Sequence, residues 1–215
     1  MLDLDRGGAQ MVQGAAGAIE VLVDLPGSPR IGAAIVAHPQ PLLGGNARHK
    51  LPQFLARGLA DAGWLVVRPN FRGVGGSAGA HDAGEGESED LLKLAMSLQD
   101  DASGPALALV GFSFGAYVQA RVAKRLADLG RPAARVALAG MPFGVVTGGR
   151  RYDPPDGIAH ALVVHGEIDD RVALKAIFDW ARPKSHPVVV VPGADHFFTG
   201  KLHVLRALVL AHLCI

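Results

Sequence analysis

The feature that most constrains this chain is a serine enclosed by glycines, Gly111-Phe112-Ser113-Phe114-Gly115. Residues 106–110 before it form a short, continuous apolar run typical of a buried strand. Residues 114–129 after it repeat apolar side chains at steps of three and four, which predicts a helix with one buried face. A serine in this setting is typical of a sharp strand-to-helix turn that exposes its hydroxyl. We therefore predict that Ser113 is a nucleophile. The alternative is an ordinary strand-to-helix turn, since a chain with 28 glycines can contain this short motif by chance.

Length and composition predict a single α/β domain over residues 1–215. A chain with 49% hydrophobic and 19% charged residues can bury a sheet and is too apolar to be disordered. The formal net charge of +1 gives no reason to expect nucleic acid or an acidic membrane as a partner. No basic and then apolar segment opens the chain, so we expect no secretory signal. Cys214 is the single cysteine, so it cannot form an internal disulfide, and we expect it to be a small apolar residue of a terminal helix. A chain with neither a secretory signal nor an internal disulfide is expected in the cytoplasm.

Strand and helix patterns alternate along most of the chain, as in a mostly parallel sheet with helices on both faces. Residues 11–25 alternate in polarity around a turn signal, which predicts an antiparallel hairpin at the N-terminal edge of the sheet. Further strands are predicted at residues 31–37, 64–68, 106–110, 135–139, 161–164 and 187–191. Helices are predicted around residues 51–59, 87–98, 114–129, 172–180 and 202–213, and the last is too short and too often interrupted by polar residues to span a membrane. The connection over residues 141–159 is too short and irregular for a cap domain.

A glycine-rich segment over residues 70–79 satisfies the G-x-G-x-x-A pattern of a dinucleotide-binding turn. That pattern should join a strand directly to a helix, whereas residues 80–86 lack apolar periodicity. His81, Asp82 and Glu85 follow and could suggest metal ligands, but no closed ligand set is evident and a hydrated polar loop is the favoured interpretation. We therefore predict neither a cofactor nor a metal.

A serine hydroxyl needs a base, and the base needs a carboxylate that orients it and stabilises its charged form. Asp169 and His196 both lie in loops after predicted strands, on the side of the sheet where Ser113 is expected. Asp170 is the nearest rival for the acid, and Asp195 is disfavoured because side chains adjacent in sequence rarely face each other. Ser113, Asp169 and His196 are the predicted catalytic residues.

Eight other histidines compete with His196. His165 is expected to be a buried structural residue bonded to the backbone, and His38 a structural residue that holds its loop. The others that we expect to lie away from the site are His160, His186, His203 and His212.

Five stretches, taken in order, resemble the α/β hydrolases, and in particular the small group without a cap that is related to serine aminopeptidases and dienelactone hydrolases. They are residues 37–45, 68–75, 111–115, 165–169 and 193–198, so the resemblance covers nearly the whole chain. It implies an α/β-hydrolase fold with Ser113, Asp169 and His196 at the triad positions. It also implies an oxyanion hole made by the backbone amides of Phe114 and Gln40. Where many such enzymes have His-Gly, this chain has His38 followed by proline, and since residues 39 and 41 are both proline, only the amide of Gln40 is available there.

These features together predict a serine hydrolase that cleaves a carboxylic ester or thioester of a small soluble molecule through an acyl-enzyme. Met141, Pro142 and Phe143 leave the strand beside the elbow and are predicted to bind the substrate's acyl part. One alternative is an aminopeptidase-like amide hydrolase, for which Glu85 or Asp82 could be nominated to bind a substrate ammonium. Another is a binding protein that keeps the fold without the activity. Haloalkane and epoxide hydrolases are disfavoured because they carry aspartate at the elbow, and no oligomeric state is indicated.

Overall fold

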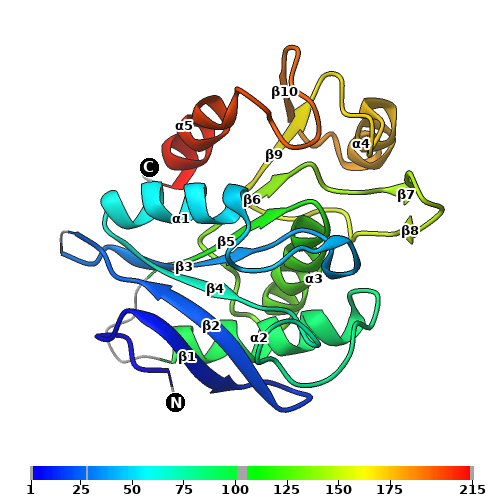
Figure 1. Cartoon of the computed structure of the whole chain (residues 1–215). Coiled ribbons are helices and arrows are strands. Elements are labelled where there is room, and N and C mark those ends of the chain that lie inside the picture. The colour runs from blue at the N-terminus through cyan, green and yellow to red at the C-terminus, as the bar shows by residue number, and fades with distance from the viewer. Residues whose placement is uncertain (1, 28, 101–105, 214–215) are drawn as a thin grey trace.

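A mostly parallel, twisted sheet runs through the centre of the molecule (Figure 1). The structure is a computed structural model that describes residues 2–27, 29–100 and 106–213, so Cys214 lies outside the described residues. Within them, the sheet has eight strands in the order β1-β2-β4-β3-β5-β6-β9-β10. Their bounds are Gly8–Gln13 (β1), Ala18–Asp24 (β2), Gly32–Ala37 (β3), Trp64–Pro69 (β4), Ala106–Phe112 (β5), Arg135–Ala139 (β6), Ala161–Gly166 (β9) and Val188–Val191 (β10).

The strands pair as the sequence pattern predicts. β1 and β2 form an antiparallel hairpin, β2 pairs antiparallel with β4, and the remaining neighbours are parallel. The predicted antiparallel N-terminal edge is therefore confirmed. Every residue of β3 and β4 is buried, which explains why these strands are apolar at nearly every position instead of alternating in polarity. The exception is Arg68 of β4, whose Nε donates to Asp24 at 2.7 Å.

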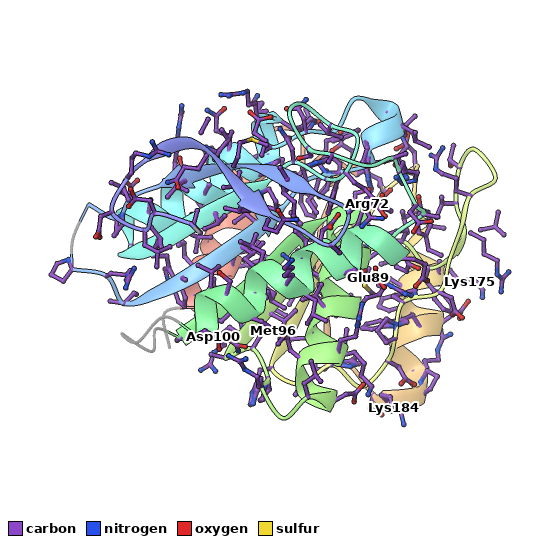
Figure 2. All side chains as sticks on the ribbon, turned by 90° about the horizontal axis from the view of Figure 1, so that it is seen from below. Arg72, Glu89, Met96, Asp100, Lys175 and Lys184 are labelled. Carbon is purple, nitrogen blue, oxygen red and sulfur yellow. The ribbon has the colours of Figure 1, made fainter. Side chains whose placement is uncertain are left out.

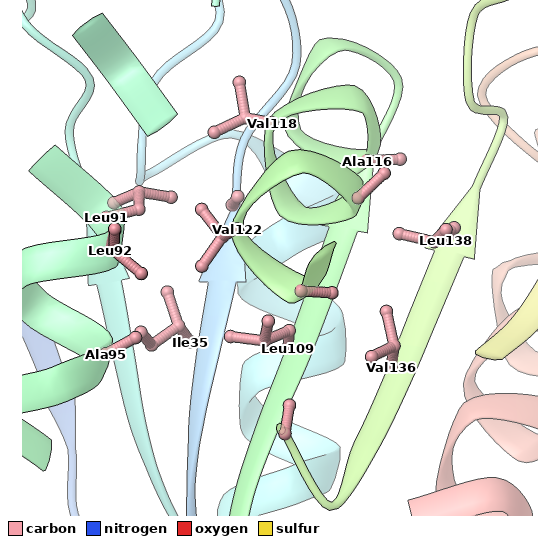
Figure 3. Packing of buried hydrophobic residues seen from close by; sticks show 14 of the residues in the cluster. Ile35, Leu91, Leu92, Ala95, Leu109, Ala116, Val118, Val122, Val136 and Leu138 are labelled. Carbon is pink, nitrogen blue, oxygen red and sulfur yellow. The ribbon is translucent and has the colours of Figure 1, made fainter. Parts of the chain in front are cut away.

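Helices cover both faces of the sheet (Figure 1). α1 (Lys50–Asp61) and α5 (Leu202–Leu213) pack on one face, and α2 (Glu85–Gln99), α3 (Phe114–Asp128) and α4 (Leu174–Ala181) pack on the other. Figure 3 shows the second face, where Val122 of α3 lies over Ile35 of β3 and Leu109 of β5 within one buried cluster. Among the described residues, no helix combines the length and the hydrophobicity that crossing a membrane requires.

The start of α2 differs from the prediction for a physical reason. The helix begins at Glu85, two residues before the predicted start, because the buried Glu87 side chain accepts hydrogen bonds from the backbone of Asp82 and Gly84 at 2.9 Å each. This side chain satisfies the amide of the N-cap residue Gly84 and that of Asp82 before the helix. The start of α2 is therefore determined by the hydrogen bonds of a buried polar side chain, which the pattern of apolar residues does not reveal.

The glycine-rich segment over residues 70–79 is an irregular loop between β4 and α2. Arg72 anchors it, because its Nε donates to the Asp90 carboxylate of α2 at 2.8 Å. The other oxygen of Asp90 accepts from the backbone of Ala15 at 2.7 Å, so the same carboxylate also holds the N-terminal hairpin. Figure 2 shows Arg72 beside the N-terminal half of α2, with Glu89 and Met96 further along that helix.

Residues 141–159 form a small projection and not a cap. β7 (Gly144–Val145) and β8 (Arg151–Tyr152) pair as a two-stranded antiparallel hairpin. Thr147 at its turn ties the hairpin to the loop after β9, because its amide donates to Arg171 O at 3.2 Å and its hydroxyl donates to Asp170 O at 3.0 Å. The hairpin is therefore held close to the carboxyl ends of the central strands.

We expect Gly111→Ala to lower the free energy of unfolding by about 1–3 kcal/mol or more, the usual cost of forcing extra atoms into a packed interior. A Cβ at this position would lie 2.4 Å from the Gly115 carbonyl oxygen, and backbone atoms cannot give way as a flexible side chain can. Gly27→Ala is the matched control, because no atom lies within 4 Å of a Cβ built there. Urea denaturation of both variants measures the difference, and equal stabilities would contradict the close packing at the elbow.

Candidate active site

Ser113 lies at the turn between β5 and α3, in a strained backbone conformation with φ 54° and ψ −122°. The turn is held from both sides. The Ser113 amide donates to Ala139 O at the end of β6 at 2.9 Å, and a Cβ on Gly115 would lie 2.4 Å from Ala37 O at the end of β3. This is the geometry of a nucleophile elbow, and it leaves the Ser113 hydroxyl at the positive end of a 15-residue helix.

Asp169 and His196 come from the loops that follow β9 and β10. These loops pack backbone against backbone, because Ile168 N donates to Ala194 O at 3.0 Å and a Cβ on Gly166 would lie 2.5 Å from the same oxygen. His196 Nδ1 is 2.7 Å from Asp169 Oδ2, and His196 Nε2 is 2.9 Å from Ser113 Oγ. Because an ionised carboxylate can only accept, Nδ1–H donates to Asp169 and Nε2 is left to accept from the serine hydroxyl.

The Asp169 carboxylate is held in its ionised form. Its second oxygen accepts from the backbone amides of Arg171 at 2.9 Å and Val172 at 2.8 Å. Burial by itself would raise the pKa of Asp169, but the hydrogen bond and charge of His196, with the Val172 amide, outweigh it and lower the pKa below its usual value. α4 begins at Leu174 and not at the predicted residue 172, and residues 171 and 172 belong to the loop whose amides hold Asp169.

The rival acids do not reach His196 in this structure. The Asp170 side chain is exposed, and Asp195 accepts from the Thr199 amide at 2.8 Å as a cap of the following turn. The Asp195 pKa is lowered by that backbone hydrogen bond.

The predicted structural role of His165 is confirmed. It is fully buried, and its Nε2 lies 2.8 Å from Val172 O. Burial lowers the pKa of His165, so the ring stays neutral beside Asp169. The cavity described below is not lined by any of His160, His186, His203 and His212, in keeping with their predicted place away from the site.

Gln40 and Phe114, whose backbone amides are the predicted oxyanion donors, line the same cavity as Ser113. Gln40 lies three residues after the end of β3, at the start of a short 3-10 turn (Pro41–Leu43), and Phe114 is the first residue of α3. In the part of the chain that the structure describes, neither amide donates to a protein acceptor. The Gln40 side chain, in contrast to its backbone amide, is hydrogen-bonded within the protein. Its Nε2 donates to Tyr152 Oη at 2.9 Å, and its Oε1 accepts from Leu42 N at 3.3 Å. The loop that carries Gln40 is thus tied to the β7–β8 hairpin.

His38 fixes the other side of this loop. Its Nδ1 lies 2.7 Å from Pro39 O and its Nε2 accepts from the Phe71 amide at 3.1 Å, so both ring nitrogens are used in the neutral form. Burial, only partly opposed by the hydrogen bond to Pro39, lowers the pKa of His38 to about 4. His38 is therefore the structural residue that the sequence predicts.

Ser113 and His196 open into a cavity of about 90 Å³. Of the three predicted substrate-wall residues, Pro142 lines it, whereas Met141 is fully buried in the core and Phe143 is half-buried against that core. The wall comes instead from residues of the β7–β8 hairpin and from neighbours of the site residues. These are Val146, Thr147, Arg150, Tyr152, Arg171, Val172 and Phe197, together with Leu43 and His49 from the β3 side.

The sequence offered a partial signal for this wall. Arg171, Val172 and Phe197 lie within three positions of Asp169 or His196, so adjacency to the predicted site could have identified them. The hairpin residues have no such signal, since strands of two residues carry no periodicity.

Comparison with known proteins gives consistent matches. No protein-family model matches the chain. An uncharacterised protein of Rickettsia prowazekii is 33% identical over 200 residues, which cover 87% of this chain and 81% of that protein. An α/β serine hydrolase without a lid from Xanthomonas campestris superposes with a TM-score of 0.87 at 34% identity, covering 99% of this chain and 96% of the other. An α/β serine hydrolase homologue from Coxiella burnetii superposes with a TM-score of 0.82 at 34% identity, covering 95% and 96%.

The neutral state of His38 predicts a pH dependence of stability. The folded pKa of about 4 lies below the ordinary 6.5, so the unfolded chain binds the proton more readily between these values. The stabilisation is complete above pH ~6.5 and is lost as the pH falls toward the folded pKa, by about 2 kcal/mol at pH ~5. We expect His38→Gln to be destabilised at pH ~7.5 and the difference from wild type to shrink by about this amount at pH ~5.

Urea unfolding of both proteins at the two pH values tests this expectation. The difference in the free energy of unfolding between variant and wild type removes the pH-dependent contributions of the other histidines. These include His165, whose pKa is also lowered by burial. A difference that stays constant with pH would show that His38 does not titrate as its environment indicates.

Proposed function

This chain belongs to the α/β serine hydrolases that lack a lid, and on that premise we propose that it cleaves a carboxylic ester or thioester of a small molecule through an acyl-enzyme on Ser113. The observation that carries the proposal is the unbroken hydrogen-bond chain from Ser113 through His196 to Asp169, with distances of 2.9 and 2.7 Å. A nucleophile, a base and an orienting carboxylate in this sequence form a complete acyl-transfer site.

In the first half-reaction, His196 Nε2 takes the hydroxyl proton as Ser113 Oγ attacks the carbonyl carbon. Asp169, kept ionised by its surroundings, stabilises the imidazolium and holds the ring orientation. The amides of Gln40 and Phe114 donate to the developing oxyanion. The tetrahedral species then expels the alcohol or thiol, which receives the proton from His196. Water repeats the sequence on the acyl-enzyme and releases the acid.

The charge around the cavity favours an ester over the substrate of an aminopeptidase. A free ammonium would need a carboxylate near the site, but the Glu85 side chain is largely exposed and pairs with Arg121, and neither it nor Asp82 lines the cavity. Two arginines, Arg150 and Arg171, line it instead. A cationic wall opposes the binding of a substrate amine.

The small cavity and the absence of a cap favour short acyl groups over long-chain lipids. Residues of the hairpin over 144–152 line the cavity, and at about 90 Å³ the cavity has little room for a long acyl chain, which would extend into water.

We expect Ser113→Ala and His196→Ala each to remove nearly all ester turnover without unfolding the protein, since the residues of a triad act as a unit. Asp169→Asn should lower kcat by about 10⁴ because it leaves His196 in the wrong tautomer. Asp170→Asn is the matched control and should change the rate little. Steady-state kinetics on short para-nitrophenyl esters and labelling by a fluorophosphonate measure these effects, and labelling should require Ser113.

Two outcomes would count against this proposal. One is a folded wild-type protein that neither turns over any short ester nor reacts with the fluorophosphonate, which would favour a binding protein with a hydrolase fold. The other is an Asp170→Asn variant that loses more activity than Asp169→Asn, which would move the acid by one residue.

Backbone and side-chain roles at Gln40 can be separated. Gln40→Pro removes the amide and should lower kcat by about 10² to 10³, the usual loss for one oxyanion donor. Gln40→Ala keeps the amide and should retain substantial activity, although it loses the bond to Tyr152. Circular dichroism and fluorophosphonate labelling check that the proline variant is folded, and a folded variant as active as Gln40→Ala would place the second donor elsewhere.

A further inference from the structure

We propose that the ester hydrolysed at Ser113 carries a negative charge close to the scissile bond, such as a free carboxylate, and that Arg150 and Arg171 bind this charge. The inference rests on the proposed function and narrows its substrate class from any small ester to an anionic one. It is carried by the placement of two arginines that no carboxylate neutralises in the part of the chain that the structure describes.

Arg150 lines the cavity and has one guanidinium donor without a partner among the described residues. It lies at the end of the β7–β8 turn, and its Nε is buried without a hydrogen-bond partner among the residues that the structure describes. The contact that its Nη2 makes with Thr147 O is long, at 3.4 Å. A buried charged donor without an acceptor is unfavourable, and a ligand that supplies an anionic oxygen would satisfy it.

Arg171 brings a second positive charge to the same cavity. Its guanidinium carbon lies 5.8 Å from the centre of the Phe197 ring, and that ring lies 5.2 Å from the ring of His196. The backbone of Arg171 is fixed at both ends, because its amide donates to Asp169 and its carbonyl accepts from Thr147. The Thr147 bond also joins the segments that carry the two arginines, so both charges are presented by one connected wall.

These arginines differ from the other cations near the strand ends. Arg68 and Arg72 are paired with Asp24 and Asp90 at 2.7 and 2.8 Å. No carboxylate lies within ion-pair distance of Arg150 or Arg171 in residues 2–27, 29–100 and 106–213, and none lines the cavity. The cavity wall thus has a positive charge that a substrate anion can balance.

A bound anion would help both binding and chemistry. Guanidinium groups bind carboxylates with charge-assisted hydrogen bonds, which are stronger than those between neutral groups. The same anion would offset arginine charge that otherwise opposes the imidazolium formed on His196 during attack. The small cavity places such an anion only a few atoms from the ester carbonyl.

The test compares esters that differ only in charge. One pair puts the charge on the acyl side, as the mono-para-nitrophenyl ester of adipic acid and its neutral methyl ester. The second pair puts it on the leaving group, as para-butanoyloxybenzoate and its methyl ester. Wild type should prefer the anionic member of at least one pair by about tenfold or more in kcat/KM, chiefly through a lower KM. The preference should weaken as salt is raised, because the Arg171 side chain is exposed.

Arginine variants identify the groups responsible. Arg150→Gln and Arg171→Gln should each reduce the anionic-to-neutral ratio by about tenfold, and Arg150→Lys should restore part of it because the charge remains. Arg151→Gln is the matched control, since Arg151 is an exposed arginine of the same hairpin that does not line the cavity. The control should keep the wild-type ratio.

The outcomes separate the inference from the proposed function. Neutral esters turned over with no anionic preference in either pair would overturn the anion site and leave the hydrolase assignment standing. If Arg151→Gln lost as much of the anionic preference as the cavity variants, the anion site would also be overturned. The preference would then come from the overall positive charge of this surface and not from a specific site. A wild-type protein that hydrolyses neither member of either pair and resists the fluorophosphonate would overturn the proposed function and the inference with it.

Discussion

The close approach of backbone to backbone around Ser113 is the constraint on which the rest of the site depends. The residues at 111 and 115 must be glycine, because a Cβ at either would lie 2.4 Å from a carbonyl oxygen. That closeness lets the first turn of α3 rest on the end of β3, while the Ser113 amide bonds to the end of β6. The strained conformation of one residue is thus supported by two neighbouring strands, and the serine hydroxyl has a fixed place.

The site keeps opposite protonation states within a short distance. Asp169 remains ionised because His196 and two backbone amides stabilise its charge more than burial disfavours it. Burial lowers the pKa of His38 and of His165 and so favours the neutral ring. In each residue one ring nitrogen is hydrogen-bonded to a backbone carbonyl. Desolvation therefore leaves the aspartate charged and the histidines neutral, because hydrogen-bond donors stabilise the charged form of Asp169 only.

The β7–β8 hairpin gives the site its chemical character beyond the three central residues. Tyr152 holds the Gln40 loop, Thr147 joins the hairpin to the segment after Asp169, and Arg150 adds charge to the wall. A short hairpin can do this because its contacts reach two loops that the sheet already places together. In a protein without a lid, this projection is where substrate preference can be set.

The sequence by itself determined the parallel sheet with its antiparallel edge, the order of helices, and the strand-end loops that carry Ser113, Asp169 and His196. These follow from local patterns of apolar residues, and β6 (Arg135–Ala139) and α5 (Leu202–Leu213) have the predicted bounds. Only the tertiary structure decided the cavity wall. It buried Met141 in the core and brought Arg150 and Arg171 to the site, since their positions depend on a hairpin of two-residue strands anchored by Thr147 to a segment 23 residues away. Contacts between distant segments leave no periodic pattern in either one.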